Sequence, residues 1–94
     1  MGSDEDFREE KLSRAISAYS RRQILRLLAE KEMTVTEVCK KTGQSKSLAS
    51  RHLTMLHDLG FLNVRKESPH KFYSLKIKEL RSLLDVYDTV IEKI

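Results

Sequence analysis

A glycine flanked by two helix-start signals is the feature that most constrains this fold. Thr34 and Glu37 match a capping box, in which each side chain bonds the backbone N–H of the other residue. Gly43 can adopt the left-handed conformation that ends a helix. Ser45 can cap the next helix almost at once. The sequence therefore predicts a short helix through Lys41, a tight turn and a second, longer helix.

Apolar periodicity predicts three more helices and the end of the fourth. Apolar residues recur at steps of mostly three to five residues over 4–19, which predicts an amphipathic first helix. The segment Ser20-Arg21-Arg22-Gln23 matches another capping box, so we expect a second helix to begin there and to end near Lys31. Gly60 ends the longer helix that Ser45 caps. A continuous apolar stripe over 76–94 predicts the last helix.

Two short segments of strand character lie between the last two helices. Residues 61–65 and 71–75 carry aromatic and β-branched side chains and are separated by a polar turn around Ser68-Pro69-His70. A helix, turn and helix followed by a hairpin is the plan of a winged helix-turn-helix. We therefore predict a single mainly α domain over 1–94 with a small β-hairpin. The helix-turn-helix covers 34–59 and the wing covers 61–75.

Composition and charge narrow the class of protein. The 94 residues suit one core, and no run approaches the roughly 18 apolar residues of a membrane span. With one cysteine, Cys39, the chain has no internal disulfide, which fits a reducing cytoplasm. Five carboxylates lie between Asp4 and Glu10, whereas seven Lys and Arg residues lie between Lys40 and Lys71. The middle of the chain is therefore where we expect an anion to bind.

The first turns of the helix that Ser45 caps suit a DNA groove because their side chains are small or cationic. The expected contacts from this helix and its turn are Gln44, Ser45, Lys46, Ser47, Ser50, Arg51 and His52. Those expected from the wing are Arg65, Lys66, His70 and Lys71. His52 either donates to a phosphate or packs locally, and His70 either touches DNA or is simply solvated.

The run Gln44-Ser45-Lys46-Ser47-Leu48-Ala49-Ser50-Arg51-His52-Leu53-Thr54-Met55-Leu56, followed by Leu59-Gly60-Phe61-Leu62, resembles the recognition segment of ArsR/SmtB-type transcriptional regulators. The match is closest over 50–53, and the resemblance covers 20–94. It implies a homodimeric repressor that places two copies of the recognition helix in successive major grooves of double-stranded DNA. It also implies that the segments 1–19 and 76–94 pair across the two-fold axis. Their apolar stripes support this independently, through Phe7, Leu12, Ile16, Leu80, Leu84, Tyr87 and Ile91.

The sequence departs from the family at its metal sites. Where many members carry paired thiols, this chain aligns Thr34 and Thr36, and Cys39 alone is too few ligands for a thiolate site. The carboxylates of the last helix have no histidine beside them. We therefore predict no metal and no cofactor, and the small-molecule effector stays unknown. Cys39 is either a buried small side chain or a redox or intersubunit residue.

Two other classes of function remain to be weighed. No glycine-rich phosphate loop, Gly-x-Ser-x-Gly elbow or carboxylate pair near a histidine is present, so catalysis is not expected. A winged helix can instead serve as a protein-interaction module or as a non-specific architectural DNA binder. Lys46 and Arg51 beside Ser47 and Ser50 favour DNA over an apolar protein surface.

Overall fold

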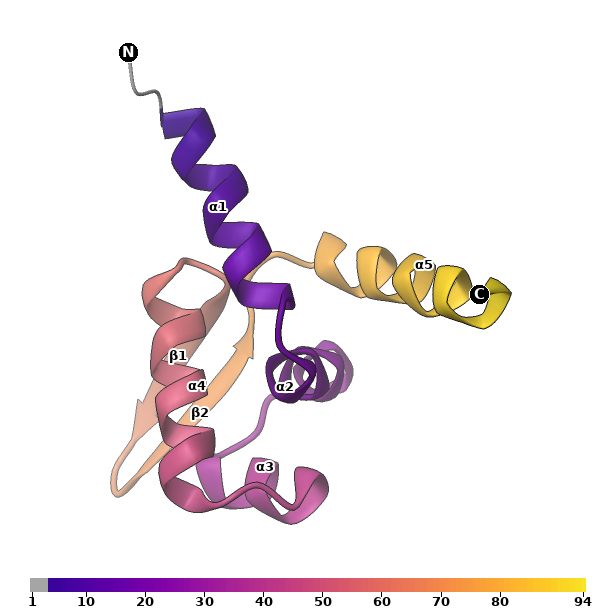
Figure 1. Cartoon of the computed structure of the whole chain (residues 1–94). Helices are drawn as coiled ribbons and strands as arrows, with labels where there is room; N and C mark the ends of the chain where they lie inside the picture. Colours follow the sequence, from indigo (N-terminus) through magenta and orange to yellow (C-terminus); the bar gives the residue numbers. More distant parts are fainter. Residues whose placement is uncertain (1–3) are drawn as a thin grey trace.

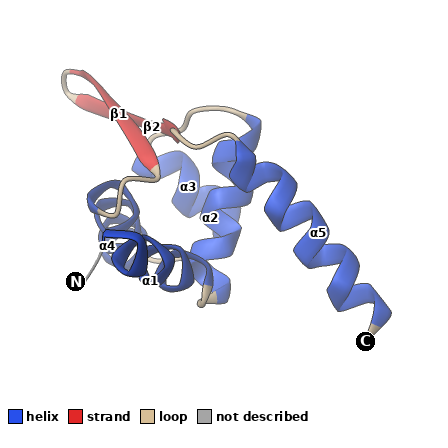
Figure 2. Ribbon diagram, turned by 90° about the horizontal axis from the view of Figure 1, so that it is seen from above, coloured by secondary structure: helices blue, strands red, loops and turns tan. Residues whose placement is uncertain are grey.

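The computed structural model describes residues 4–94, with side chains from Phe7 onward, so residues 1–3 of the expected first segment lie outside it. Helices α2, α3 and α4 surround the base of the hairpin, while α1 and α5 project from this body in different directions (Figures 1 and 2). This order confirms the predicted winged helix-turn-helix. The elements are α1 (Asp4–Ile16), α2 (Tyr19–Glu30), α3 (Val35–Thr42), α4 (Lys46–Asp58), β1 (Leu62–Glu67), β2 (His70–Leu75) and α5 (Glu79–Lys93).

The caps predicted around the turn between α3 and α4 are confirmed. Thr34 Oγ1 accepts from the Glu37 backbone N–H at 3.2 Å, and Glu37 Oε1 accepts from the Thr34 N–H at 2.9 Å. Gly43 adopts φ 78° and its N–H donates to a carbonyl of the last turn of α3. Ser45 Oγ accepts from the Leu48 N–H at 3.2 Å and so caps α4. Local hydrogen bonds therefore define both ends of the turn.

The capping box predicted at Ser20 is wrong. Helix α2 begins at Tyr19, and its N-cap is Ala18, which has the extended backbone of a cap but no side-chain cap bond. Ser20 thus lies inside the first turn, where its hydroxyl is 2.9 Å from His52 Nε2. The Ser20 hydroxyl therefore contacts the distant His52, and not the local backbone N–H that the sequence pattern predicted.

Arginines of α2 bond the carbonyls at the end of α1, which stops at Ile16 rather than reaching Tyr19. Arg21 Nε donates to the Arg14 carbonyl at 3.0 Å, and Arg22 Nη1 donates to the Ile16 carbonyl at 2.6 Å. These bonds satisfy carbonyls that have no partner within the helix. The sharp corner between α1 and α2 is stabilised by side chains that come after it.

The wing is a regular two-stranded antiparallel hairpin, longer than predicted. Its register runs from Leu62 opposite Leu75 to Glu67 opposite His70, so His70 belongs to β2 rather than to the turn. Met33, just before α3, pairs with Tyr73 through backbone hydrogen bonds of 2.9 and 2.8 Å. The base of the wing is therefore fixed to the body of the helix-turn-helix.

The core lies between α2, α4, the wing base and the first half of α5. Two residues expected in a dimer interface, Leu80 and Leu84, are 3% and 2% exposed and belong to this core, which corrects their assignment. Periodicity identifies an apolar side of a helix but not which neighbour covers it. The apolar side chains of α5 that remain at least 40% exposed are Leu83, Val86, Val90 and Ile91. No described helix has the length and apolar character that a membrane span requires.

Candidate nucleic-acid interface

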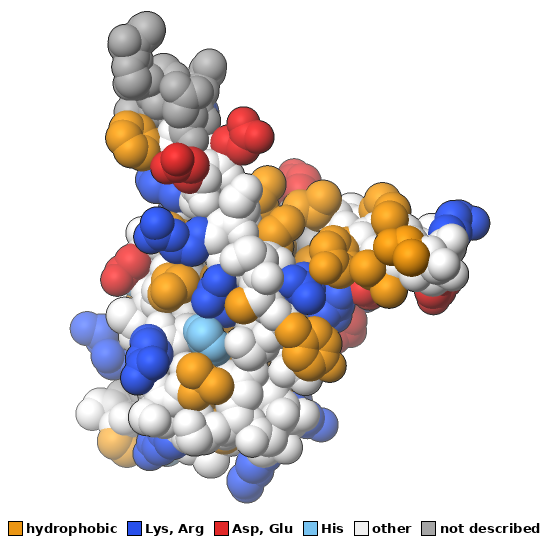
Figure 3. Space-filling model, viewed as in Figure 1, with side chains coloured by type: hydrophobic (Ala, Val, Ile, Leu, Met, Phe, Trp, Pro, Cys, Tyr) orange, Lys and Arg blue, Asp and Glu red, His pale blue; other side chains and the backbone are white. Residues whose placement is uncertain are grey.

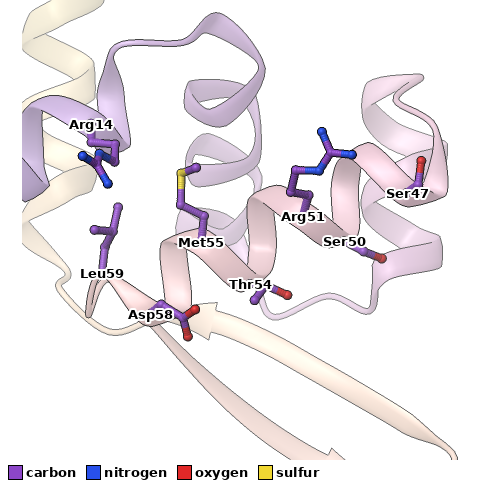
Figure 4. Close-up of a pocket in the computed structure, with 8 residues that line it drawn as sticks. All are labelled: Arg14, Ser47, Ser50, Arg51, Thr54, Met55, Asp58 and Leu59. Carbon is purple, nitrogen blue, oxygen red and sulfur yellow. The ribbon is translucent and has the colours of Figure 1, made fainter.

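Helix α4 presents a polar outer face. Lys46, Ser47, Arg51 and Thr54 are exposed, and Ser50 is half-buried between them. Figure 4 shows Ser47, Ser50, Arg51 and Thr54 along one side of the helix. On the opposite side, Ala49, Leu53 and Leu56 are fully buried. The residues that sequence analysis predicted as outward therefore share one accessible face, with small hydroxyls between two cations.

His52 lies inside the protein and does not join this face. It is 7% exposed, and its Nε2 faces the Ser20 hydroxyl. Burial lowers the pKa of His52, and the positive charges of Arg21 and Arg51 lower it further. Because His52 is buried and its Nε2 already faces Ser20, its side chain is not presented to DNA, and local packing replaces the DNA contact as its assignment.

Gln44 attaches the turn of the helix-turn-helix to α2. Its Nε2 donates to the Ser20 carbonyl at 3.0 Å and lies 3.5 Å from Gln23 Oε1. Ser20 therefore binds the turn through its carbonyl and the middle of α4 through its hydroxyl. Sequence reasoning missed this role because the partners are 24 and 32 positions away and leave no local pattern.

Two lysines stand side by side on the wing. Lys66 and Lys71 are directly opposite each other in the hairpin register, and both are exposed. Like charges at such a pair destabilise a hairpin unless an anion lies nearby. Both lysines also line a groove of about 220 Å³ that Thr54 and His57 of α4 border. The wing therefore holds a paired cationic site next to the outer face of α4.

Arg65 differs from these lysines because its charge is already compensated. Its guanidinium contacts the carboxylates of Glu32 at 2.7 Å and Glu67 at 3.3 Å, and it stacks 4.5 Å from the Phe72 ring. The hydrogen bond to Glu32 raises the pKa of Arg65. Arg65 thus connects the wing to the segment before α3, whereas Lys66 and Lys71 form no ion pair with any residue that the structure describes.

The acidic and thiol side chains of the described residues do not converge. No group of three or more His, Cys, Asp or Glu in this part of the chain is placed to hold a metal ion. Cys39 is half-buried on α3, and Asp88 of α5 pairs with Arg26 of α2 at 2.5 Å. The Asp88 carboxylate of α5 therefore serves an ion pair within the protomer.

A helix-turn-helix, a wing anchored to it and a polar outer face on the second helix define a winged helix-turn-helix DNA-binding protein. Comparisons with known proteins identify the family within this class. Residues 20–64 match the family model described as "Bacterial regulatory protein, arsR family". Over 75 residues the chain is 33% identical to the transcriptional activator HlyU of Vibrio cholerae, covering 80% of this chain and 69% of that protein. The chain belongs to the ArsR family of bacterial transcriptional regulators.

Solved structures agree with this assignment. The structure of HlyU from V. cholerae has a TM-score of 0.80 at 29% identity and covers 96% of this chain and 97% of its own. A homodimeric winged helix-turn-helix DNA-binding domain from Mycobacterium bovis, described as a possible ArsR-family regulator, has a TM-score of 0.78 at 26% identity. That match covers 92% of this chain and 80% of the M. bovis chain. The matched family model describes bacterial regulatory proteins, and the V. cholerae relative is described as a transcriptional activator.

Proposed function

We propose that two copies of this chain form a dimer that binds a pseudo-palindromic operator and represses transcription by occluding the promoter. The observation that carries the DNA-binding part is the position of the Lys66 and Lys71 pair beside the outer face of α4. A helix in the major groove has a phosphate backbone next to it, and paired lysines there supply the opposite charge. Ser47 and Arg51 then face the base edges.

The proposed contacts follow from exposure and free charge. Base edges and nearby phosphates would be met by Ser45, Lys46, Ser47, Ser50 and Arg51, and flanking phosphates by Lys66, His70 and Lys71. Gln44, His52 and Arg65 are assigned to holding these elements in place, because each is bonded within the protomer. In this division residues 34–59 read DNA and residues 61–75 clamp its backbone.

The proposed dimer uses the apolar surface that α1 and α5 leave uncovered. Leu83, Val86 and Val90 of α5 and Phe7 of α1 are 41–60% exposed. Figure 3 shows apolar side chains along α5 and in the angle between α5 and α1. A groove of about 420 Å³ in this region is lined by Leu12, Phe61 and Ile77, among others. A contiguous apolar surface of this kind is typical of a protein interface, and the M. bovis neighbour is homodimeric.

Repression and the absence of metal sensing are finer parts of the proposal. A dimer that spans successive major grooves denies the same duplex to polymerase, which supports repression, although the V. cholerae relative is named an activator. Thr34 and Thr36 offer no thiolates, and Thr34 is engaged in the α3 cap. Transcription in vitro from a promoter that contains the operator, with and without Zn²⁺, tests both parts. An increase in transcript on adding the protein would contradict repression. Loss of repression on adding Zn²⁺ would contradict metal independence.

The decisive experiment is selection of bound duplexes from a random pool, followed by affinity measurements at several salt concentrations. We expect half-sites about one helical turn apart and a steep salt dependence. Arg51→Ala should weaken binding to the selected site by about 1–3 kcal/mol and relax specificity at one position. Strong binding without an enriched sequence would indicate an architectural DNA binder. No binding at all would favour a protein-interaction module.

A further inference from the structure

A second groove runs along α4 on the side that faces α1. It has a volume of about 720 Å³, and Arg14 of α1 and Arg51 of α4 both line it (Figure 4). The hydroxyls of Ser47, Ser50 and Thr54 line it as well. Two guanidiniums and three hydroxyls are donors of the kind that bind phosphate oxygens. Asp58 is the acidic residue of this lining, so the ionised side chains carry an excess of one positive charge.

Arg14 differs from the arginines that follow it. Arg21 and Arg22 use their guanidiniums to bond Ser17 and the carbonyls at the end of α1. In the part of the chain that the structure describes, Arg14 contributes its backbone carbonyl to this corner, while its exposed guanidinium makes no hydrogen bond or ion pair. The hydrogen bonds at the corner therefore hold the backbone of Arg14 in place, and its side-chain charge is available to a ligand.

The α1 groove and the wing groove lie on opposite sides of α4. Thr54 lines both of them: the wing groove with Lys66 and Lys71, and the α1 groove with Arg14. A helix seated in the major groove of B-DNA has one sugar-phosphate backbone on each side, about 12 Å apart. The wing lysines can meet only the backbone on their own side of α4.

We propose that Arg14 binds the second backbone, so that the α1–α4 groove holds DNA phosphates on the side of α4 opposite the wing. This inference rests on the proposed DNA-binding function and adds α1 to the DNA-binding surface. Each protomer then grips the major groove from both sides, with α4 between two cationic sites. Arg14 carries no base specificity in this arrangement, because a phosphate contact positions the protein without reading sequence.

The test compares Arg14→Gln with Lys31→Gln. Lys31 is an exposed cation at the end of α2, and it lines neither the α1–α4 groove nor the apolar groove of the proposed dimer interface. Both variants lose one positive charge per subunit, so a general electrostatic effect would be equal in the two. The measurements are affinity for the selected operator at several salt concentrations, sequence preference, and circular dichroism to verify folding.

We expect Arg14→Gln to reduce the slope of log K against log salt by about 1.8 for a dimer, or about 0.9 per lost phosphate contact. Sequence preference should not change, Arg14→Lys should retain most of the slope, and Lys31→Gln should match the unmodified protein. Equal slopes for Arg14→Gln and the unmodified protein, or equal losses for both glutamine variants, would overturn the inference while leaving the proposed function intact. An unmodified protein that binds no DNA would overturn both.

Discussion

Replacing Ser20 with alanine tests the contact that holds the recognition helix to α2. His52 is 7% exposed, its Nε2 has Ser20 Oγ at 2.9 Å, and its Nδ1 has no hydrogen-bond partner among the described residues. Ser20→Ala therefore leaves both ring nitrogens of a buried imidazole unsatisfied. Such a loss costs about 1–3 kcal/mol, and the better helix propensity of alanine returns about 0.5 kcal/mol. The net expected loss of unfolding free energy is roughly 0.5–2.5 kcal/mol.

Thermal melting followed by circular dichroism measures this loss. For a domain of this size, each kcal/mol lowers Tm by about 4–8 °C. All variants must be compared at one protein concentration, because the stability of a dimer depends on concentration. Ser82→Ala is the matched control, since Ser82 is exposed on α5 and gains the same propensity without losing the contact.

A second variant separates the hydrogen bond from a general packing effect. In the double variant Ser20→Ala with His52→Leu, both polar partners are replaced by apolar groups, so most of the lost stability should return. If Ser20→Ala is as stable as Ser82→Ala, the Ser20–His52 contact does not stabilise the fold. Continued instability of the double variant would show that packing, not the hydrogen bond, explains the loss.

Three further predictions concern pH, assembly and the wing. Because the folded-state pKa of His52 is lowered, the unfolded chain binds the proton more readily, so unfolding free energy in urea should fall as pH drops below about 6.5. His52→Gln should flatten that decline. If the variant and the unmodified protein had the same pH profile, His52 would not be the cause of the decline. Val90→Glu should convert a dimer to a monomer in sedimentation, whereas Thr89→Glu, also exposed on α5, should not; a dimeric Val90→Glu protein would contradict the α5 interface. Lys66→Gln should reduce the salt slope of operator binding, whereas Arg65→Gln should leave it unchanged because two carboxylates already compensate that charge; equal losses would refute this division.

The sequence by itself determined the features that depend on residues close together in the chain. The capping box of Thr34 and Glu37, the left-handed Gly43 and the Ser45 cap require only a few neighbouring residues, so α3, its turn and the start of α4 could be predicted. The polar outer side of α4 followed from the same helical period. The hairpin was predictable too, although pairing extended it to His70.

Tertiary structure alone decided how each side chain is used, because the competing partners are far away in sequence. Ser20 has the pattern of a cap, yet an imidazole 32 positions later takes its hydroxyl. Leu84 has the same spacing as a dimer residue, but its own core buries it. Arg65 and Lys66 are adjacent cations, and only the folded chain brings Glu32 to the first and places the second opposite Lys71. Composition and period specify which residues seek a partner, and the packing of distant segments decides which partner they find.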